Sequence, residues 1–156
     1  MSLIKLFIIA LILISINSCS VNSGIEYAKA PKPSHSSLKN SVYIIHYGST
    51  KGDDFGQIIS IDGKYLTTLP GDRYTWLILP TGKHIVFTKN PLLDAQIIDR
   101  KVNQSSYDIF VNNTSAQYYL FSYIWIGDTF KRVFKEVSPD VGKELLRKCK
   151  YIKNSR

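Results

Sequence analysis

Residues 57–69 read QIISIDGKYLTTL, and this stretch decides the fold class. Two runs rich in β-branched residues flank the pair Asp62-Gly63. An Asp-Gly pair between such runs is the strongest short signal for a β-hairpin, because both turn positions need a positive φ. We therefore predict strands at 57–61 and 64–69, joined by a two-residue turn in which Gly63 has φ > 0.

The same pattern of extended runs and turn residues continues on both sides of this hairpin. Further runs with strand character cover residues 41–47, 73–79, 83–89, 95–102, 107–112, 117–126 and 130–137. Turn residues separate most of them at intervals of roughly eight to twelve residues, which is typical of β-sandwiches and barrels. The sequence predicts a mainly β domain, a small antiparallel β-sandwich of about seven to nine strands.

One helix is predicted after the last strand. Ser138-Pro139-Asp140 has the composition of an N-cap followed by the first two helical positions. The apolar residues that follow, at steps of four and three, are Val141, Leu145, Cys149 and Ile152. This stripe predicts a helix packed on the sheet, with Cys149 buried, unreactive and without a redox role. Gly142 lowers the stability of such a helix by roughly 1 kcal/mol relative to Ala.

The first residues have the pattern of an export signal. Lys5 is followed by the apolar run 6–16, which is shorter than the roughly 20 residues of a membrane span. The next residues, Ile16-Asn17-Ser18-Cys19, resemble the lipobox of bacterial lipoproteins. We therefore expect a signal peptide at 1–18 and acyl chains on Cys19, which anchor a protein stably when two or more are present. Ser20, in place of Asp, indicates the periplasmic face of the outer membrane.

Residues 19–40 differ in composition from both neighbours. Ser, Asn, Lys and Ala dominate, Pro31 and Pro33 interrupt the segment, and no apolar periodicity is evident. We predict a lipidated Cys19 followed by a flexible tether with a reach of about 25 Å. The sandwich with its helix then occupies residues 41–156.

The chain is basic, with a net charge of +8 from 20 basic and 12 acidic residues. From Lys131 onward, nine basic residues face three acidic ones. Such an excess of basic residues indicates either a solvated surface or an anionic neighbour. The two cysteines of the chain provide no disulfide framework. We expect contact with membrane lipid through acylated Cys19, and with an anionic envelope component through the basic end. We expect no nucleic acid and no cofactor, and the sequence indicates no particular oligomeric state.

Few residues have the spacing of a catalytic or metal site. His46 and His84 lie in predicted strands, and together with Lys83 they form the candidate ligand surface. The acids that would complete a metal site with the two histidines are Asp53, Asp54 and Asp62, although ordinary strand histidines are the favoured interpretation. No nucleophile elbow or phosphate-binding loop is present, so we predict no catalytic residues and no enzyme activity.

The strand 117–126 is unusually aromatic. Alternate residues on one face are Tyr119, Phe121, Tyr123 and Trp125, and on the other face Tyr118, Leu120, Ile124 and Ile126. Because both faces are apolar, burial in a central strand is favoured. An open aromatic face that stacks on sugar rings is the alternative.

Several motifs together resemble a bacterial lipoprotein family catalogued as domain of unknown function 2846. The resembling motifs are IDGK at 61–64, LPTGKH at 79–84, SAQYY at 115–119 and ELLRKCK at 144–150. The resemblance spans roughly residues 41–150, and His46, Thr81 and Ala116 depart from the family pattern. It implies an anchored β-sandwich whose role is open. We expect an envelope lipoprotein with a non-enzymatic binding or scaffolding domain. The alternative is a carbohydrate-binding or hydrolase-accessory module that uses an aromatic and acidic surface.

Overall fold

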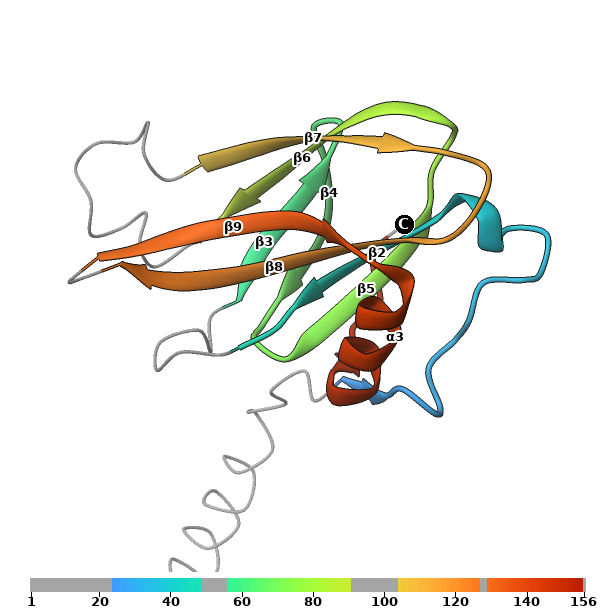
Figure 1. Cartoon of the computed structure of the whole chain (residues 1–156), viewed down its shortest axis with the longest axis horizontal. Helices are drawn as coiled ribbons and strands as arrows, with labels where there is room; N and C mark the ends of the chain where they lie inside the picture. The colour runs from blue at the N-terminus through green and yellow to red at the C-terminus, as the bar shows by residue number, and fades with distance from the viewer. Residues whose placement is uncertain (1–23, 49–55, 91–103, 127–128, 156) are drawn as a thin grey trace, which may run out of the picture.

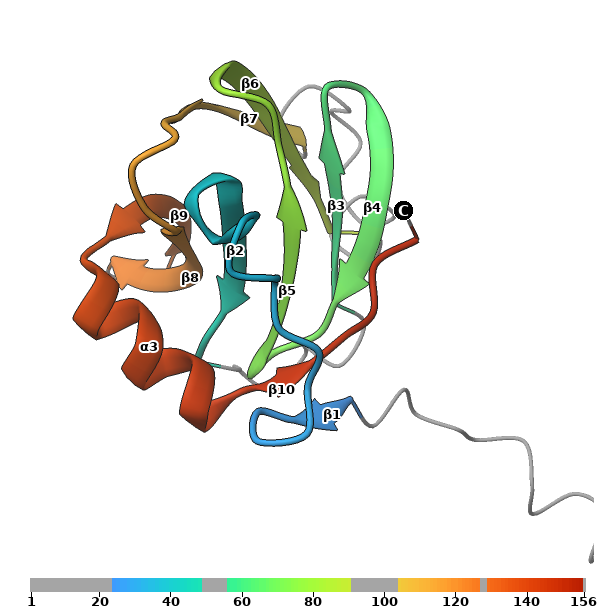
Figure 2. The same ribbon diagram turned by 90° about the vertical axis from the view of Figure 1, so that its right-hand side faces the viewer.

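The computed structural model describes residues 24–48, 56–90, 104–126 and 129–155. Two β-sheets pack face to face, and one helix covers the outer face of the larger sheet (Figures 1 and 2). The six-stranded sheet has the order β1 (Ile25–Glu26), β10 (Lys150–Tyr151), β5 (Arg73–Ile78), β2 (Ser41–His46), β8 (Gln117–Ile126) and β9 (Thr129–Val137). The four-stranded sheet has the order β4 (Lys64–Leu69), β3 (Gln57–Ile61), β6 (Gly82–Lys89) and β7 (Gln104–Val111). The predicted β-sandwich with one C-terminal helix is confirmed.

The hairpin of β3 and β4 forms as predicted. Asp62 has φ 51° and Gly63 has φ 75°, so both turn residues are left-handed. This geometry matches the right-handed twist of the flanking strands and explains why Asp-Gly stands here. A register shift between Ile59 and Ser60 then adds a bulge to the pair.

Strand order is the part of the fold that the sequence pattern does not specify. Most neighbours pair antiparallel, but β2 pairs parallel with β8, and β10 pairs parallel with β5. Strand β2 lies inside the six-stranded sheet, and all six of its residues are buried. This burial on both faces agrees with the apolar run from Val42 to Ile45.

Two apolar cores lie on opposite faces of the six-stranded sheet. The core between the sheets is built from aliphatic side chains of both sheets: Val42, Ile44, Ile59, Ile61, Leu66, Leu69, Leu77, Leu79, Val86, Ile109, Val111 and Ile152, with Tyr119. The second core lies under the helix and is rich in tyrosine: Tyr43, Tyr74, Tyr118 and Tyr151 with Ala30, Ile45, Leu145, Leu146 and Cys149.

Helix α3 (Pro139–Lys148) begins at the predicted N-cap, where the Ser138 hydroxyl accepts a hydrogen bond from the Val141 amide at 3.5 Å. The predicted apolar stripe is wrong at both of its ends. Val141 is 45% exposed, and Ile152 lies beyond the helix in the core between the sheets. The backbone becomes extended at Cys149, so the helical spacing of the apolar residues ends there. The predicted burial of Cys149 is confirmed, with 2% of the residue exposed.

The flexible tether predicted for residues 19–40 is contradicted from residue 24 onward. Strand β1 pairs with β10, and Ala30 is buried in the tyrosine-rich core. The Trp76 indole donates a hydrogen bond of 2.9 Å to the Pro31 carbonyl, which holds this segment on the sheet. A short helical turn, η1 (Leu38–Asn40), then leads into β2. Main-chain pairing and a few scattered apolar side chains hold the segment, and neither produces a periodic sequence pattern.

Some sequence predictions fall outside the described residues. They are the signal peptide with Cys19, the acids Asp53 and Asp54, and the strand predicted at 95–102. Strand β7 starts at Gln104, three residues before its predicted beginning. None of the helices in the described ranges has both the length and the apolar character needed to cross a bilayer.

Candidate functional site

His46 is a buried link between the two sheets. Its Nδ1 atom lies 3.0 Å from the Leu69 carbonyl oxygen of β4, across the interior of the sandwich. Its ring meets the ring of Phe121 edge-on, with centroids 5.0 Å apart. Because the side chain is fully buried, it is not part of an open ligand surface.

His84 joins two turns at the other end of the four-stranded sheet. Its Nδ1 atom lies 2.7 Å from a carboxylate oxygen of Asp62, and its Nε2 atom lies 2.8 Å from the Pro80 carbonyl oxygen. The other Asp62 oxygen accepts a hydrogen bond from the Ile85 amide at 2.9 Å. Both ring nitrogens therefore face acceptors, an arrangement in which a protonated imidazole donates twice.

Lys83 points to the opposite face of β6 from His84, since neighbouring strand residues alternate. Its ammonium group pairs with Asp108 at 2.8 Å, and both side chains are 64% exposed, so the pair adds little stability. His46 lies near Leu69 at one end of the hairpin, and His84 lies near Asp62 at the other. The structure therefore does not bring the three predicted ligand residues together. Within the described ranges, no three His, Cys, Asp or Glu side chains gather as a metal site.

A groove lies beside α3, and we call it the tyrosine groove. It lies between the segment 27–39, the helix, and the turn from β7 to β8, with a volume of about 560 Å³. Figure 2 shows that segment running over the six-stranded sheet next to α3. The groove is lined by Tyr27, Pro31, Lys32, Pro33, His35, Leu38, Lys39, Tyr43, Tyr74, Thr114, Ser115, Ala116, Tyr118, Pro139, Lys143 and Leu146. Its volume is in the usual range for small-ligand sites.

Stacked rings form the floor of the tyrosine groove. Tyr43 and Tyr118 lie parallel with centroids 4.9 Å apart, and α3 presses on the second ring. A Cβ atom on Gly142 would lie 2.3 Å from Cγ of Tyr118, so only glycine allows this approach. Burial, followed by repulsion from neighbouring tyrosines, raises the pKa of Tyr43 and Tyr118 above the usual value. Their hydroxyls are therefore neutral at physiological pH.

The charged side chains around the tyrosine groove have one sign. Lys32, Lys39 and Lys143 are exposed, and His35 lies between the first two along the chain. The Lys32 ammonium group lies 5.3 Å from the centre of the Tyr27 ring. No carboxylate is among the described residues that line the groove. An apolar floor with a basic rim suits a ligand that has an apolar body and a negative charge.

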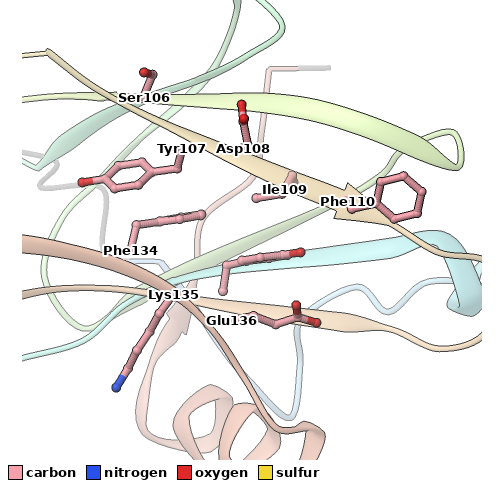
Figure 3. Close-up of a pocket in the computed structure, with 9 residues that line it drawn as sticks. Ser106, Tyr107, Asp108, Ile109, Phe110, Phe134, Lys135 and Glu136 are labelled. Atoms are coloured by element: carbon pink, nitrogen blue, oxygen red, sulfur yellow. The ribbon is translucent and has the colours of Figure 1, made fainter.

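A second hollow of about 430 Å³ opens between the edge strands β7 and β9 (Figure 3). Tyr107 stacks on Phe134 with centroids 4.9 Å apart, and Phe134 stacks on Tyr119 at 5.4 Å. These three rings join the two sheets along the edge of the sandwich. Burial, and then the nearby Glu136, raises the pKa of Tyr119 to about 12.

The two acids beside this second hollow are each held by another side chain. Asp108 points away from the rings in Figure 3 and is held by Lys83. The Glu136 carboxylate accepts a hydrogen bond from Gln117 Nε2 at 3.2 Å.

The sequence pattern does not reveal most of the tyrosine groove, because it predicts a tether at Lys32, His35 and Lys39. The available signal was Ile25, Tyr27 and Ala30, apolar residues that a solvated linker does not need. The prediction that both faces of strand 117–126 are buried is confirmed in part. Tyr118, Tyr119 and Phe121 are buried, but Ile124 is 48% exposed. The Trp125 side chain lies outside the described residues.

Comparison with known proteins finds no matching family model, no matching curated protein and no matching solved structure.

Proposed function

We propose that this chain is a bacterial envelope lipoprotein, cut before Cys19 and held on the outer membrane by acyl chains on that residue. The proposal rests on the export signal and on the Ile16-Asn17-Ser18-Cys19 motif. The likeness of the hairpin and turn motifs to the lipoprotein family catalogued as domain of unknown function 2846 points the same way. Its β-sandwich binds a ligand and performs no chemistry on it.

The tyrosine groove is the observation that carries the binding proposal. It combines a mostly apolar lining with three lysines and a histidine, and no described lining residue is acidic. A ligand with an alkyl or ring body and a phosphate or carboxylate group complements both features. We therefore propose an anionic amphiphile of the envelope as the ligand.

The anchor is tested by replacing Cys19 with Ser. The thioether to the lipid needs the sulfur atom, so C19S removes incorporation of a fatty-acid probe and leaves an uncut or soluble protein. Metabolic labelling of producing cells measures this, with Cys149→Ser as the control that keeps Cys19. Equal labelling of wild type and C19S rules out the lipoprotein assignment.

The groove is tested by titrating the full-length protein with octyl phosphate and measuring binding by calorimetry. Octyl glucoside controls for the apolar chain, and inorganic phosphate controls for the charge. Lys143→Glu should weaken octyl phosphate binding at least about tenfold, because it places a carboxylate at the rim. Lys64→Glu, a matched exposed lysine on β4, should leave binding unchanged.

Two results contradict the groove proposal. If octyl phosphate does not bind, the groove is not a ligand site for this class of molecule. If octyl glucoside binds equally well and K143E has no effect, the ligand does not need a negative charge.

A carbohydrate-binding module is the second candidate, and the ring stack beside β7 favours it. Tyr107 and Phe134 are half-buried and border an open hollow, which is the usual setting for stacking on a sugar ring. Neutral oligosaccharide binding that Tyr107→Ala abolishes would favour this function over the groove ligand.

A further inference from the structure

Strand β1 determines where the chain leaves the domain toward Cys19. It pairs antiparallel with β10, and the Lys150 amide donates to the Asp72 carbonyl at 3.1 Å. Gly24 sits so close to this pair that a Cβ atom on it would lie 2.9 Å from Cβ of Lys150. We call the end of the sandwich formed by β1, β10 and the last turn of α3 the anchor end. It lies at the bottom of Figure 2, and the turn between β3 and β4 lies at the top.

The path from Gly24 to the proposed lipid is short. Five residue steps separate Gly24 from Cys19. A fully extended chain of that length covers at most about 18 Å. The tether predicted from sequence would let the whole domain move farther from the membrane, whereas this short connection keeps the anchor end close to Cys19. This step rests on the proposed lipidation of Cys19.

The anchor end carries more positive than negative charge. Counted with the residues that adjoin it, its basic residues are Lys29, Arg73, Arg147, Lys148 and Lys150, and its acidic residues are Glu26, Asp72 and Glu144. Glu26 pairs with Lys29 at 3.8 Å, Glu144 pairs with Lys148 at 2.7 Å, and the Asp72 carboxylate accepts a hydrogen bond from the Gly48 amide at 3.0 Å. Arg147 and Lys150 are exposed on the same end. Ile25, 43% exposed beside them, adds an apolar contact.

We propose that the anchor end lies directly against an anionic phospholipid surface and that this contact orients the sandwich. A covalent anchor keeps the domain at a high effective concentration next to the bilayer, so even a modest attraction between basic residues and lipid headgroups sets its orientation. Strand β4 runs six residues from Lys64 toward the anchor end, which places Lys64 roughly 20 Å farther from the lipid. The β3–β4 turn therefore points away from the membrane.

The test uses the full lipidated protein in vesicles of phosphatidylcholine and phosphatidylglycerol that contain a nitroxide-labelled headgroup lipid. A fluorophore is attached at Arg147→Cys at the anchor end, and at Lys64→Cys as the matched exposed control. Native Cys149 is buried, so it reacts slowly with the label. We expect at least threefold stronger quenching at position 147 than at position 64. We also expect this contrast to shrink in pure phosphatidylcholine. Lys29→Cys serves as a second anchor-end variant.

Each outcome decides between the two proposals. Equal quenching at the anchor-end and control positions on lipidated protein overturns the orientation and leaves the lipoprotein assignment intact. An undiminished contrast in pure phosphatidylcholine overturns the anionic character of the surface. Protein that carries no lipid on Cys19 overturns the lipoprotein assignment and the orientation together.

Discussion

Gly142 lies where helix α3 crosses the ring of Tyr118, and two opposing effects meet at this residue. Alanine is a better helix former than glycine by roughly 1 kcal/mol, so helix propensity alone favours Gly142→Ala. Against this, the added Cβ atom would stand 2.3 Å from the ring, and overpacking of this kind costs about 1–3 kcal/mol. The ring is stacked on Tyr43, so moving away from the new Cβ atom would disturb this stack. The glycine that weakens the helix is thus what allows the helix to dock.

We expect Gly142→Ala to lower the free energy of unfolding by up to about 2 kcal/mol, measured by urea denaturation. In a Tyr118→Ala background the clash is absent, so the same change should be neutral or stabilising. A double-mutant cycle measures this reversal. Equal effects in both backgrounds would contradict the close approach.

At the scale of elements, the segment between β1 and β2 is the least expected part of the domain. It is held by a two-residue strand, by buried Ala30 and by the bond between Trp76 and Pro31. Such a segment opens locally at a much lower cost than the sheets do. Its attachment supports one wall of the tyrosine groove.

Trp76→Phe keeps an aromatic ring and removes only the indole donor. A single hydrogen bond contributes about 1 kcal/mol, so we expect amide exchange in β1 to rise about fivefold. Amides of β2 should keep their protection, because that strand opens only on global unfolding. Tyr65→Phe, which removes an exposed hydrogen bond to Thr68 on the other sheet, is the matched control. Unchanged exchange at Ile25 and Glu26 would mean that this bond does not hold the segment.

The elements that the sequence predicts well are those encoded by local rules. The turn at Asp62-Gly63 follows from backbone sterics, and the start of α3 follows from the Ser138 cap. Elements built on long-range pairing are not encoded locally. Strand β10 has two residues, and it exists only because β1 and β5 lie on either side of it. The tyrosine groove depends on such pairing, so the sequence pattern predicts its basic rim as a linker.

At the scale of the whole molecule, buried thiol and tyrosine hydroxyl groups make the free energy of unfolding depend on pH in the alkaline range. Burial, and then the nearby Asp72 carboxylate, raises the pKa of Cys149 from 9.0 to about 12, and burial raises that of Tyr119 from 10.0 to about 12. Because both values are higher in the folded state, the folded protein holds these protons more tightly than the unfolded chain does. Their contribution to stability is complete below about pH 9 and is lost as pH rises through about 12.

We therefore expect the urea midpoint to fall steadily between about pH 9 and about pH 11. Cys149→Ala should lack the part of this fall that begins near pH 9, while the part due to tyrosine remains. Circular dichroism during urea titration at each pH provides the measurement. A midpoint independent of pH across this range would show that these groups ionise as easily in the folded protein as in the unfolded chain.

The pairing of β1 with β10 has a consequence for the timing of folding. These strands stand at opposite ends of the domain's sequence, and the Ser155 amide then donates to the Leu66 carbonyl of the other sheet at 2.9 Å. The pairing of β1 with β10 therefore cannot form until the residues that follow α3 have been synthesised. Contacts between such distant residues also make folding slow, because the loop entropy is lost before the contact is gained. Under the export that we propose, this delay would favour passage of the chain before the domain becomes compact.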